Sequence, residues 1–275
     1  MYGAYKRLTT RYEGVLTGKG LTYGGSLARP EATGYGTVYF TDAMLKDRGD
    51  SLKGKKCAVS GSGNVAIYCC EKLIQLGATP VTVSDSNGTI YDPNGIKVDV
   101  LKQVKEVERA RLTRYAELVP TAQYTPVDKY PAGKHQVWTY NVDCAFPCAT
   151  QNELNEEDAK TLLANGCKVV AEGANMPSTL GAIDQFLKAK IAYGPAKAAN
   201  AGGVATSQLE MEQNAGMTAW TFEEVDQKLH TIMTNLYKNV ADTAREFGVE
   251  GNLVLGANIA GFRKVADAMI AQGVI

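Results

Sequence analysis

The chain has 275 residues, 45% of them hydrophobic, which is enough to bury a sizeable core as one large domain or two unequal ones. Lysine plus arginine equals aspartate plus glutamate at 29 each, so bulk charge recruits neither nucleic acid nor membrane. The start, MYGAYKRLTTRYEG, lacks the apolar core of a signal peptide, and no apolar run is long enough to cross a bilayer. We therefore expect a soluble, cytoplasmic protein without nucleic-acid or membrane partners.

The cysteines and histidines exclude several kinds of site. The six cysteines lie in apolar or strand-like surroundings without CxxC pairs, so we expect buried free thiols and no metal site. With only His135 and His230 in the chain, a histidine-based catalytic triad has little material.

Helix and strand patterns alternate along the chain. Helices are expected near residues 31–46, 64–76, 98–118, 156–164 and 178–189, and strands near 57–59, 80–84, 142–146, 168–171 and 191–193. Residues 120–136 are expected to form a loop, because Pro and Gly punctuate them. Thr221 and Glu224 form a capping box that opens a long helix to about residue 247, and a last helix covers about 257–272.

This alternation predicts an α/β fold, a doubly wound and mostly parallel sheet of Rossmann-like NAD(P)-binding type, with a helical carboxyl-terminal region. We expect one large domain over residues 1–250 and a carboxyl-terminal helix within residues 251–275.

The most informative segment is KCAVSGSGNVA, residues 56–66. A short strand points at a turn that needs Gly61, Gly63 lets a pyrophosphate approach the backbone, and Ala66 allows the next helix to pack on the strand. An acidic residue, Asp85, follows at about the expected 20 positions. The pattern indicates a dinucleotide phosphate site at a helix amino terminus.

The loops that leave the carboxyl ends of the strands are rich in small and amide residues, and in an open doubly wound sheet those ends make the binding crevice. Each asparagine there has an alternative interpretation as a turn or cap residue. Four of them in loops predicted to share one edge favour ligand contact: Asn64, Asn152, Asn175 and Asn200.

Five strings resemble the hexameric glutamate dehydrogenases, in order and spacing. They are RPEATGYG (29–36), GSGNVA (61–66), PCATQNEL (147–154), AEGANMPST (171–179) and KAANAGGVATSQLEMEQNA (197–215). The likeness is to the bacterial and protist NADP-dependent type and covers essentially the whole chain. It implies interconversion of L-glutamate and 2-oxoglutarate plus ammonia with NADP(H), in a homo-oligomer that is hexameric for the full-length family. It also implies that residues 1–250 form the dinucleotide-binding domain, with residues 1–25 leading in from a substrate domain, and that residues 251–275 form a returning carboxyl-terminal helix.

The resemblance also implies residue roles. Thr33 and Asn64 would bind the nicotinamide carboxamide, Ser207 the side-chain carboxylate of glutamate, and Arg29 would support the cleft. The remaining implied cofactor contacts are Gly61, Ser62, Gly63, Val65, Asp85, Ser86, Ala149, Thr150, Gln151, Asn175 and Asn200. Without the resemblance, Thr33 is equally well explained as a helix cap and Arg29 as an ion-pair residue, and an isolated Ser207 is better explained as a hydroxyl on a helix face.

No string like GGGKGG or PAxDV, which carry the family's catalytic lysines and aspartate, occurs in these residues. We therefore expect no catalytic residue in this chain, which would bind cofactor without oxidising glutamate. Alternatives are a sister dehydrogenase of leucine, phenylalanine or valine, and a non-catalytic nucleotide-binding module.

The sequence gives two opposed indications of cofactor choice. A carboxylate at Asp85 usually selects NAD, whereas the string SDSNGT resembles NADP-dependent members. Lys105, Arg109 and Arg111 are candidates for a 2′-phosphate contact, and NADP is the expected cofactor.

Overall fold

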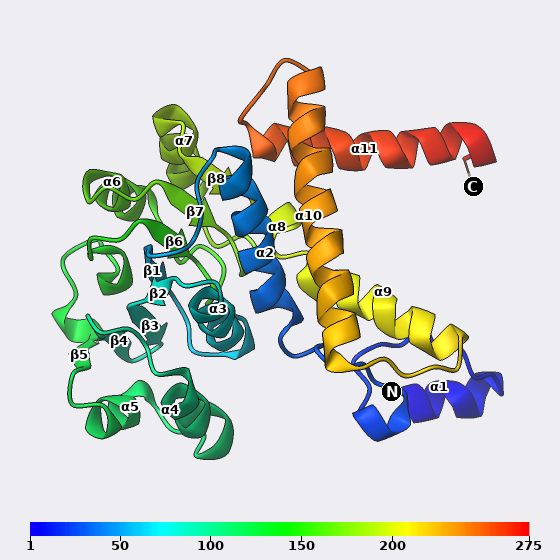
Figure 1. Cartoon of the computed structure of the whole chain (residues 1–275), viewed down its shortest axis with the longest axis horizontal. Coiled ribbons are helices and arrows are strands. Elements are labelled where there is room, and N and C mark those ends of the chain that lie inside the picture. Colours follow the sequence, from blue (N-terminus) through cyan, green and yellow to red (C-terminus); the bar gives the residue numbers. More distant parts are fainter. Residues whose placement is uncertain (275) are drawn as a thin grey trace.

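The computed structural model describes residues 1–274 and is built on a five-stranded parallel sheet. The strand order is β2-β1-β6-β7-β8, with β1 at Lys56–Val59, β2 at Thr79–Pro80, β6 at Cys144–Phe146, β7 at Val169–Ala171 and β8 at Ala192–Gly194. Helices lie on both sides of this sheet (Figure 1). The predicted doubly wound, mostly parallel α/β fold is confirmed.

The short strands are buried on both faces, and their alternation divides the core in two. Cys57 and Val59 of β1 join one hydrophobic cluster, while Ala58 between them joins the other. The first cluster includes side chains of α2 (Ala32–Asp47) and α3 (Asn64–Gln75). The second includes α6 (Glu156–Ala164) and α7 (Leu180–Ala189), so these two helix pairs cover opposite faces.

The predicted strand at 80–84 divides between two sheets. The backbone stops pairing with β1 after Val81. The Thr82 hydroxyl instead accepts from the Val59 N–H at 2.9 Å and donates to the Val59 carbonyl at 3.0 Å. The Thr82 side chain thus makes the hydrogen bonds to Val59 that a neighbouring strand's backbone would otherwise make. The backbone of β3 (Thr82–Asp85) is free to pair with β4 (Gly88–Tyr91) in a separate antiparallel sheet of order β3-β4-β5.

Two further expectations are wrong in this region. Residues 120–136 are not all loop, because β5 (Gln123–Pro126) pairs with β4; its terminal proline, tolerated at an edge strand, hid the strand pattern. The helix expected at 98–118 is broken. It comprises α4 (Val98–Lys102), a π-helical turn (Gln103–Val107) and α5 (Leu112–Leu118), with Arg109 in the left-handed region at φ 51°.

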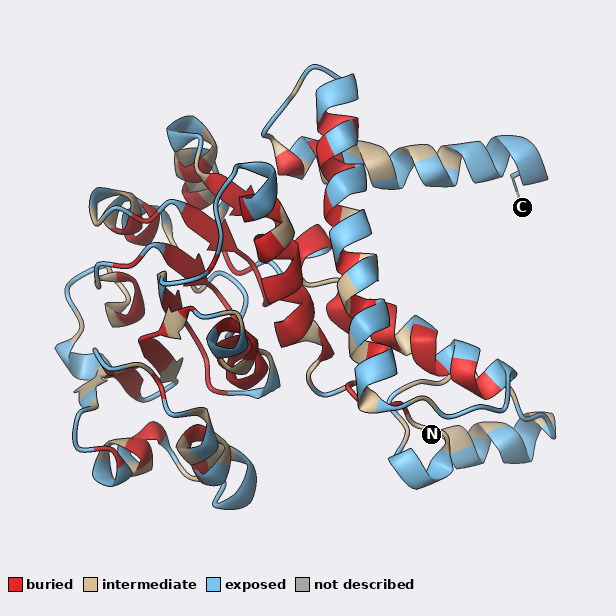
Figure 2. Cartoon of the chain, in the orientation of Figure 1, coloured by how far each residue is buried: buried red, intermediate tan, exposed pale blue. Residues whose placement is uncertain are grey.

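Helices occupy the rest of the chain. They are α1 (Tyr2–Thr9), α8 (Ala196–Ala199), α9 (Gly202–Ala215), α10 (Phe222–Glu246) and α11 (Leu253–Gln272), with short 3₁₀ turns at Leu21–Tyr23, Val127–Lys129 and Gln136–Trp138. The predicted capping box at Thr221 and Glu224 is present and opens α10. The outer part of α11 projects from the body and is largely exposed (Figures 1 and 2). Within residues 1–274, no helix has the length and apolar character needed to cross a membrane.

Helix α2 lies between the sheet and α10 and touches its neighbours through glycines (Figure 1). A β-carbon at Gly34 would lie 2.5 Å from the Cys69 nitrogen and 2.7 Å from the Val65 oxygen of α3. On another side of α2, a β-carbon at Gly36 would lie 2.7 Å from the α-carbon of Gly202 on α9. The backbones of α3 and α9 therefore both approach α2 more closely than any other residue type permits.

We expect Gly34→Ala to lower the free energy of unfolding by about 2 kcal/mol or more, because the atoms that the methyl group meets are backbone atoms that cannot rotate away. Gly261→Ala on exposed α11, where nothing lies within 4 Å, is the matched control. It should leave stability unchanged or raise it by up to about 1 kcal/mol. Urea denaturation of both variants measures this, and equal stability would contradict the close contact.

Candidate functional site

The site begins where the strand order changes direction. Strand β2 lies on one side of β1 and β6 on the other, so the loops after β1 and β6 meet at the carboxyl edge of the sheet. The Ser60 hydroxyl ties them, accepting from the Cys148 N–H at 2.9 Å. Gly61, at φ 82°, has room for only a hydrogen, since a β-carbon would lie 3.0 Å from the Ala149 α-carbon.

The amino terminus of α3 is built to receive an anion. Gly63 is its N-cap residue, and no side chain caps the helix. A β-carbon at Gly63 would meet nothing within 4 Å, so the space in front of this helix end is open. Uncapped N–H groups and the helix dipole favour a phosphate group there, and the residues present thus fit the predicted dinucleotide pyrophosphate.

Two adjoining cavities flank this helix end. The first cavity encloses about 740 Å³ and the second about 1110 Å³. Both are lined by Val65, Cys148, Ala149, Thr150 and Gln151, so the two cavities adjoin, and we call them together the trench. That shape suits an extended ligand lying across the amino terminus of α3.

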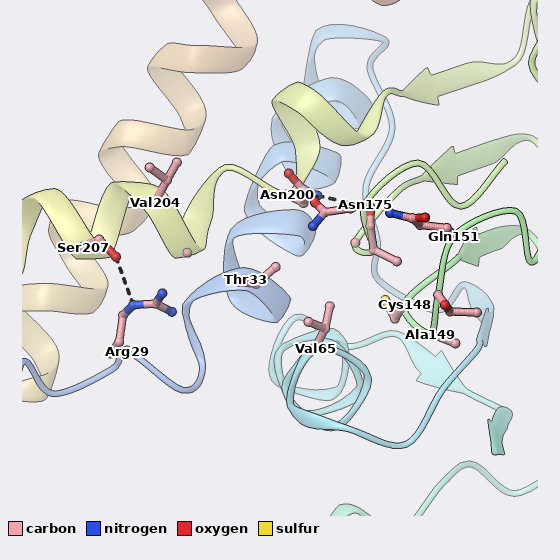
Figure 3. Close-up of a pocket in the computed structure, with 14 residues that line it drawn as sticks. Arg29, Thr33, Val65, Cys148, Ala149, Gln151, Asn175, Asn200, Val204 and Ser207 are labelled. Atoms are coloured by element: carbon pink, nitrogen blue, oxygen red, sulfur yellow. Dashed lines mark hydrogen bonds between the residues drawn. The ribbon is translucent and has the colours of Figure 1, made fainter. Parts of the chain in front are cut away.

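The first cavity lies between α2, α3 and α9 (Figure 3). The Arg29 Nε donates to the Ser207 hydroxyl at 3.2 Å, and Thr33 lies near them at the start of α2. On the opposite side, the Asn200 amide donates to the Asn175 side-chain oxygen at 2.8 Å and to the Ala174 carbonyl at 3.1 Å. Polar groups from four chain segments thus face one space.

Two carboxylates hold the loops around the trench. Glu153 accepts from the Ala149 N–H at 2.8 Å and the Thr150 N–H at 3.2 Å, which fixes the loop after β6. Glu172, only 3% exposed at the end of β7, accepts from the Ala196 N–H at 2.8 Å and so sets the start of α8. Burial raises the pKa of the Glu172 carboxyl above its usual range, while nearby hydroxyl groups oppose that shift.

The second cavity has Asp85 and Ser86 on its wall. The Asp85 carboxylate accepts from the N–H groups of Asn87 at 2.8 Å and Gly88 at 3.2 Å, and from that of Leu112, the first residue of α5, at 3.0 Å. It therefore closes the β3–β4 turn and caps α5. Ser86 is exposed, and its hydroxyl accepts from Arg111 at 2.9 Å.

We expect Asp85→Ala to lower the free energy of unfolding without any ligand, by about 1–3 kcal/mol, because three backbone N–H groups lose their acceptor. Ser86→Ala next to it should change stability by less than about 0.5 kcal/mol. Thermal unfolding of both ligand-free variants measures the difference. A stable Asp85→Ala protein would show that this carboxylate has no structural role.

The four asparagines and every contact implied by the resemblance line one of the two cavities, whereas Lys105, Arg109 and Arg111 line neither. Of the three basic residues considered for a 2′-phosphate, only Arg111 contacts Ser86, and Lys105 instead donates to the Ala110 carbonyl at 2.9 Å. All six cysteines are free and buried within residues 1–274, which confirms the interpretation of their surroundings.

Sequence reasoning missed several lining residues: Tyr130, Lys134, His135, Gly203 and Val204. The first three belong to the Pro- and Gly-rich segment before β6. The sequence signal that could have indicated them is the Lys134-His135 pair shortly before β6, a strand next to the point where the strand order changes direction. The last two open α9, where spacing alone gave no reason to separate Gly203 and Val204 from ordinary helix positions.

Fold and site together define a doubly wound, Rossmann-like α/β domain with two adjoining cavities beside the uncapped amino terminus of α3. The chain belongs to the Glutamate/Leucine/Phenylalanine/Valine dehydrogenase family, whose model matches residues 24–273.

The relatives agree with this family membership. The chain is 64% identical over 274 residues to the NADP-specific glutamate dehydrogenase of Helicobacter pylori (strain ATCC 700392 / 26695), covering all of this chain and 61% of that protein. It is 56% identical over 277 residues to the NAD(P)-specific glutamate dehydrogenase of Xylanibacter ruminicola, with the same coverage. The chain therefore spans about three fifths of the length of these relatives.

A solved structure shows the same fold. The crystal structure of Plasmodium falciparum glutamate dehydrogenase superposes with a TM-score of 0.94 at 45% sequence identity, covering all of this chain and 58% of that one.

Proposed function

We propose that this chain is the coenzyme-binding portion of an enzyme that interconverts L-glutamate and 2-oxoglutarate plus ammonia with NADP(H). The observation that carries the proposal is the pair of adjoining cavities across the uncapped amino terminus of α3. Arg29 and Ser207 line one of them, and Ser86, which is hydrogen-bonded to Arg111, lines the other. The 64% identity to an NADP-specific glutamate dehydrogenase supports it.

In this proposal the first cavity receives the nicotinamide end and the amino acid. NADP, when bound, supplies the hydride acceptor. Thr33 and Asn64 orient the nicotinamide carboxamide, and Ser207, held by Arg29 at 3.2 Å, presents its hydroxyl to the side-chain carboxylate of glutamate. Asn175 and Asn200, bonded to each other, form the opposite wall.

The second cavity receives the adenosine end. The Asp85 carboxylate is occupied by three backbone N–H groups, one of them at the start of α5, which offsets the repulsion it would exert on a 2′-phosphate. Ser86 and Arg111 offer a hydroxyl and a guanidinium side by side. That pair supports NADP over NAD.

We expect NADPH to bind more tightly than NADH, and Arg111→Ala to weaken NADPH binding about tenfold while changing NADH binding less than about twofold. Fluorescence titration at fixed ionic strength measures both. Arg114→Ala is the matched control, since this arginine of α5 pairs with Glu108 and Glu117. Equal affinity for NADH and NADPH in the unsubstituted protein, or an equal loss for both in Arg111→Ala, would contradict the assignment.

We further propose that the catalytic lysine and aspartate lie outside these 275 residues and that the chain alone does not oxidise glutamate. Proton transfer and carbonyl polarisation need a lysine beside a carboxylate in a closed cleft, and a Ser207 hydrogen bond alone is worth on the order of 1 kcal/mol.

A steady-state assay with glutamate and NADP checks this claim, with cofactor binding measured in parallel. We expect binding without turnover. Turnover within about tenfold of an intact family member, roughly 1.4 kcal/mol in activation free energy, would place a catalytic lysine within this chain.

Two alternatives are distinguished by the same cavity. A leucine, phenylalanine or valine dehydrogenase needs an apolar lining where Arg29 and Ser207 stand, so their polar pair favours glutamate. A non-catalytic nucleotide-binding module would bind cofactor without an amino-acid site.

We also propose that the protein is a cytoplasmic homo-oligomer. Exposed apolar side chains of α11, such as Phe262 at 74%, support burial of this helix in an assembly.

A further inference from the structure

His135 is fixed on the wall of the second cavity by one buried carboxylate. Asp158 of α6, which is fully buried, accepts from the His135 backbone N–H at 2.8 Å through one oxygen. Its other oxygen lies 2.7 Å from the Nδ1 of the His135 ring. Asp158 is itself held by the capping box with Asn155. Both the backbone and the ring orientation of His135 are therefore set.

The other ring nitrogen has no such bond. Because a carboxylate only accepts, Nδ1 carries a hydrogen in both protonation states of the ring. Nε2, on the far side of the ring, has no hydrogen-bond partner within residues 1–274, and the His135 side chain is 45% exposed on a residue that lines the second cavity. Nε2 is an acceptor in the neutral ring and a charged donor in the protonated ring.

Resting on the proposed function, we propose that His135 is a cofactor-binding residue whose protonated Nε2 donates a hydrogen bond to an acceptor on the adenosine half of the bound dinucleotide. The shared cavity supports this placement, because Gly61, Gly63, Ser86 and His135 all line it. The acceptor is a 2′-phosphate oxygen or an adenine or ribose acceptor.

The surroundings favour the protonated ring. The charged groups that face it are Asp158 of α6 and Glu153 of the loop after β6, with Lys134 beside it in the chain and Asp85 on the same cavity. The hydrogen bond that His135 donates to Asp158 raises the pKa of His135 above its ordinary value, against the opposing effect of burial. Affinity supplied by this donor is thus present at low pH and is lost as the pH rises through the raised pKa.

The test measures the dissociation constants of NADPH and NADH for the unsubstituted chain and for His135→Asn, from about pH 5.5 to about pH 9. The asparagine amide replaces the Nδ1 donor to Asp158 but offers nothing in place of Nε2. For each cofactor and each pH, the dissociation constant of the His135→Asn protein is divided by that of the unsubstituted chain. This ratio cancels the titration of the cofactor's own phosphate. We expect this ratio to be about five- to tenfold at low pH and to approach one at high pH.

Two further variants separate binding from a structural role. His135→Gln places an amide donor near the Nε2 position and should recover part of the affinity with no titration in this range. His230→Asn changes the other histidine of the chain, which packs on Tyr39 away from both cavities, and should keep the unsubstituted pH profile.

The outcomes are distinct. A pH-dependent ratio for NADPH alone assigns the acceptor to the 2′-phosphate, and one for both cofactors assigns it to adenine or ribose. A ratio that does not change with pH overturns the proposal and leaves His135 with only a structural role, holding the loop before β6 through its hydrogen bonds to Asp158. Failure of the unsubstituted chain to bind either cofactor would instead overturn the proposed function.

Discussion

The close approach of α2 to α3 and α9 is the contact on which the site depends. Arg29 and Thr33 lie just before and at the start of α2, Val65 lies on α3, and Ser207 lies on α9. These helices reach contact distance only because Gly34 and Gly36 present no side chain. A residue with a side chain at either position would push these helices apart and so separate the walls of the first cavity, although every polar group of the site would still be present.

Hydrogen bonds then fix the loops between these helices. Ser60 joins the two loops at the switch point, Glu153 organises the loop after β6, and Glu172 sets the start of α8. None of these three is among the residues proposed to touch the ligand. The loops therefore hold their positions through interactions made within the chain, and a ligand meets groups that are already oriented.

Local periodicity and glycine spacing predicted the parallel sheet and the loop after β1, whereas Arg29, Thr33 and Ser207 were named only through the family resemblance. Sequence reasoning failed where a distant side chain decides the local structure. Thr82 takes over the hydrogen bonds of Val59 and divides a strand, and Asp85 caps a helix that starts 27 positions later. Asp158 likewise positions His135 from another element. Such contacts leave no periodic signal.

The division at Thr82 has an evolutionary consequence. Most of the groups that would recognise the adenosine end stand on the antiparallel sheet and α5, while the phosphate loop stands on the parallel sheet. The Thr82 hydroxyl bonds Val59 across this junction, and Ser84 bonds Gly61 through both its N–H and its hydroxyl. Substitutions that alter cofactor preference can therefore accumulate on a substructure that is tied to the parallel sheet at few points, and selection on that preference need not disturb the parallel sheet.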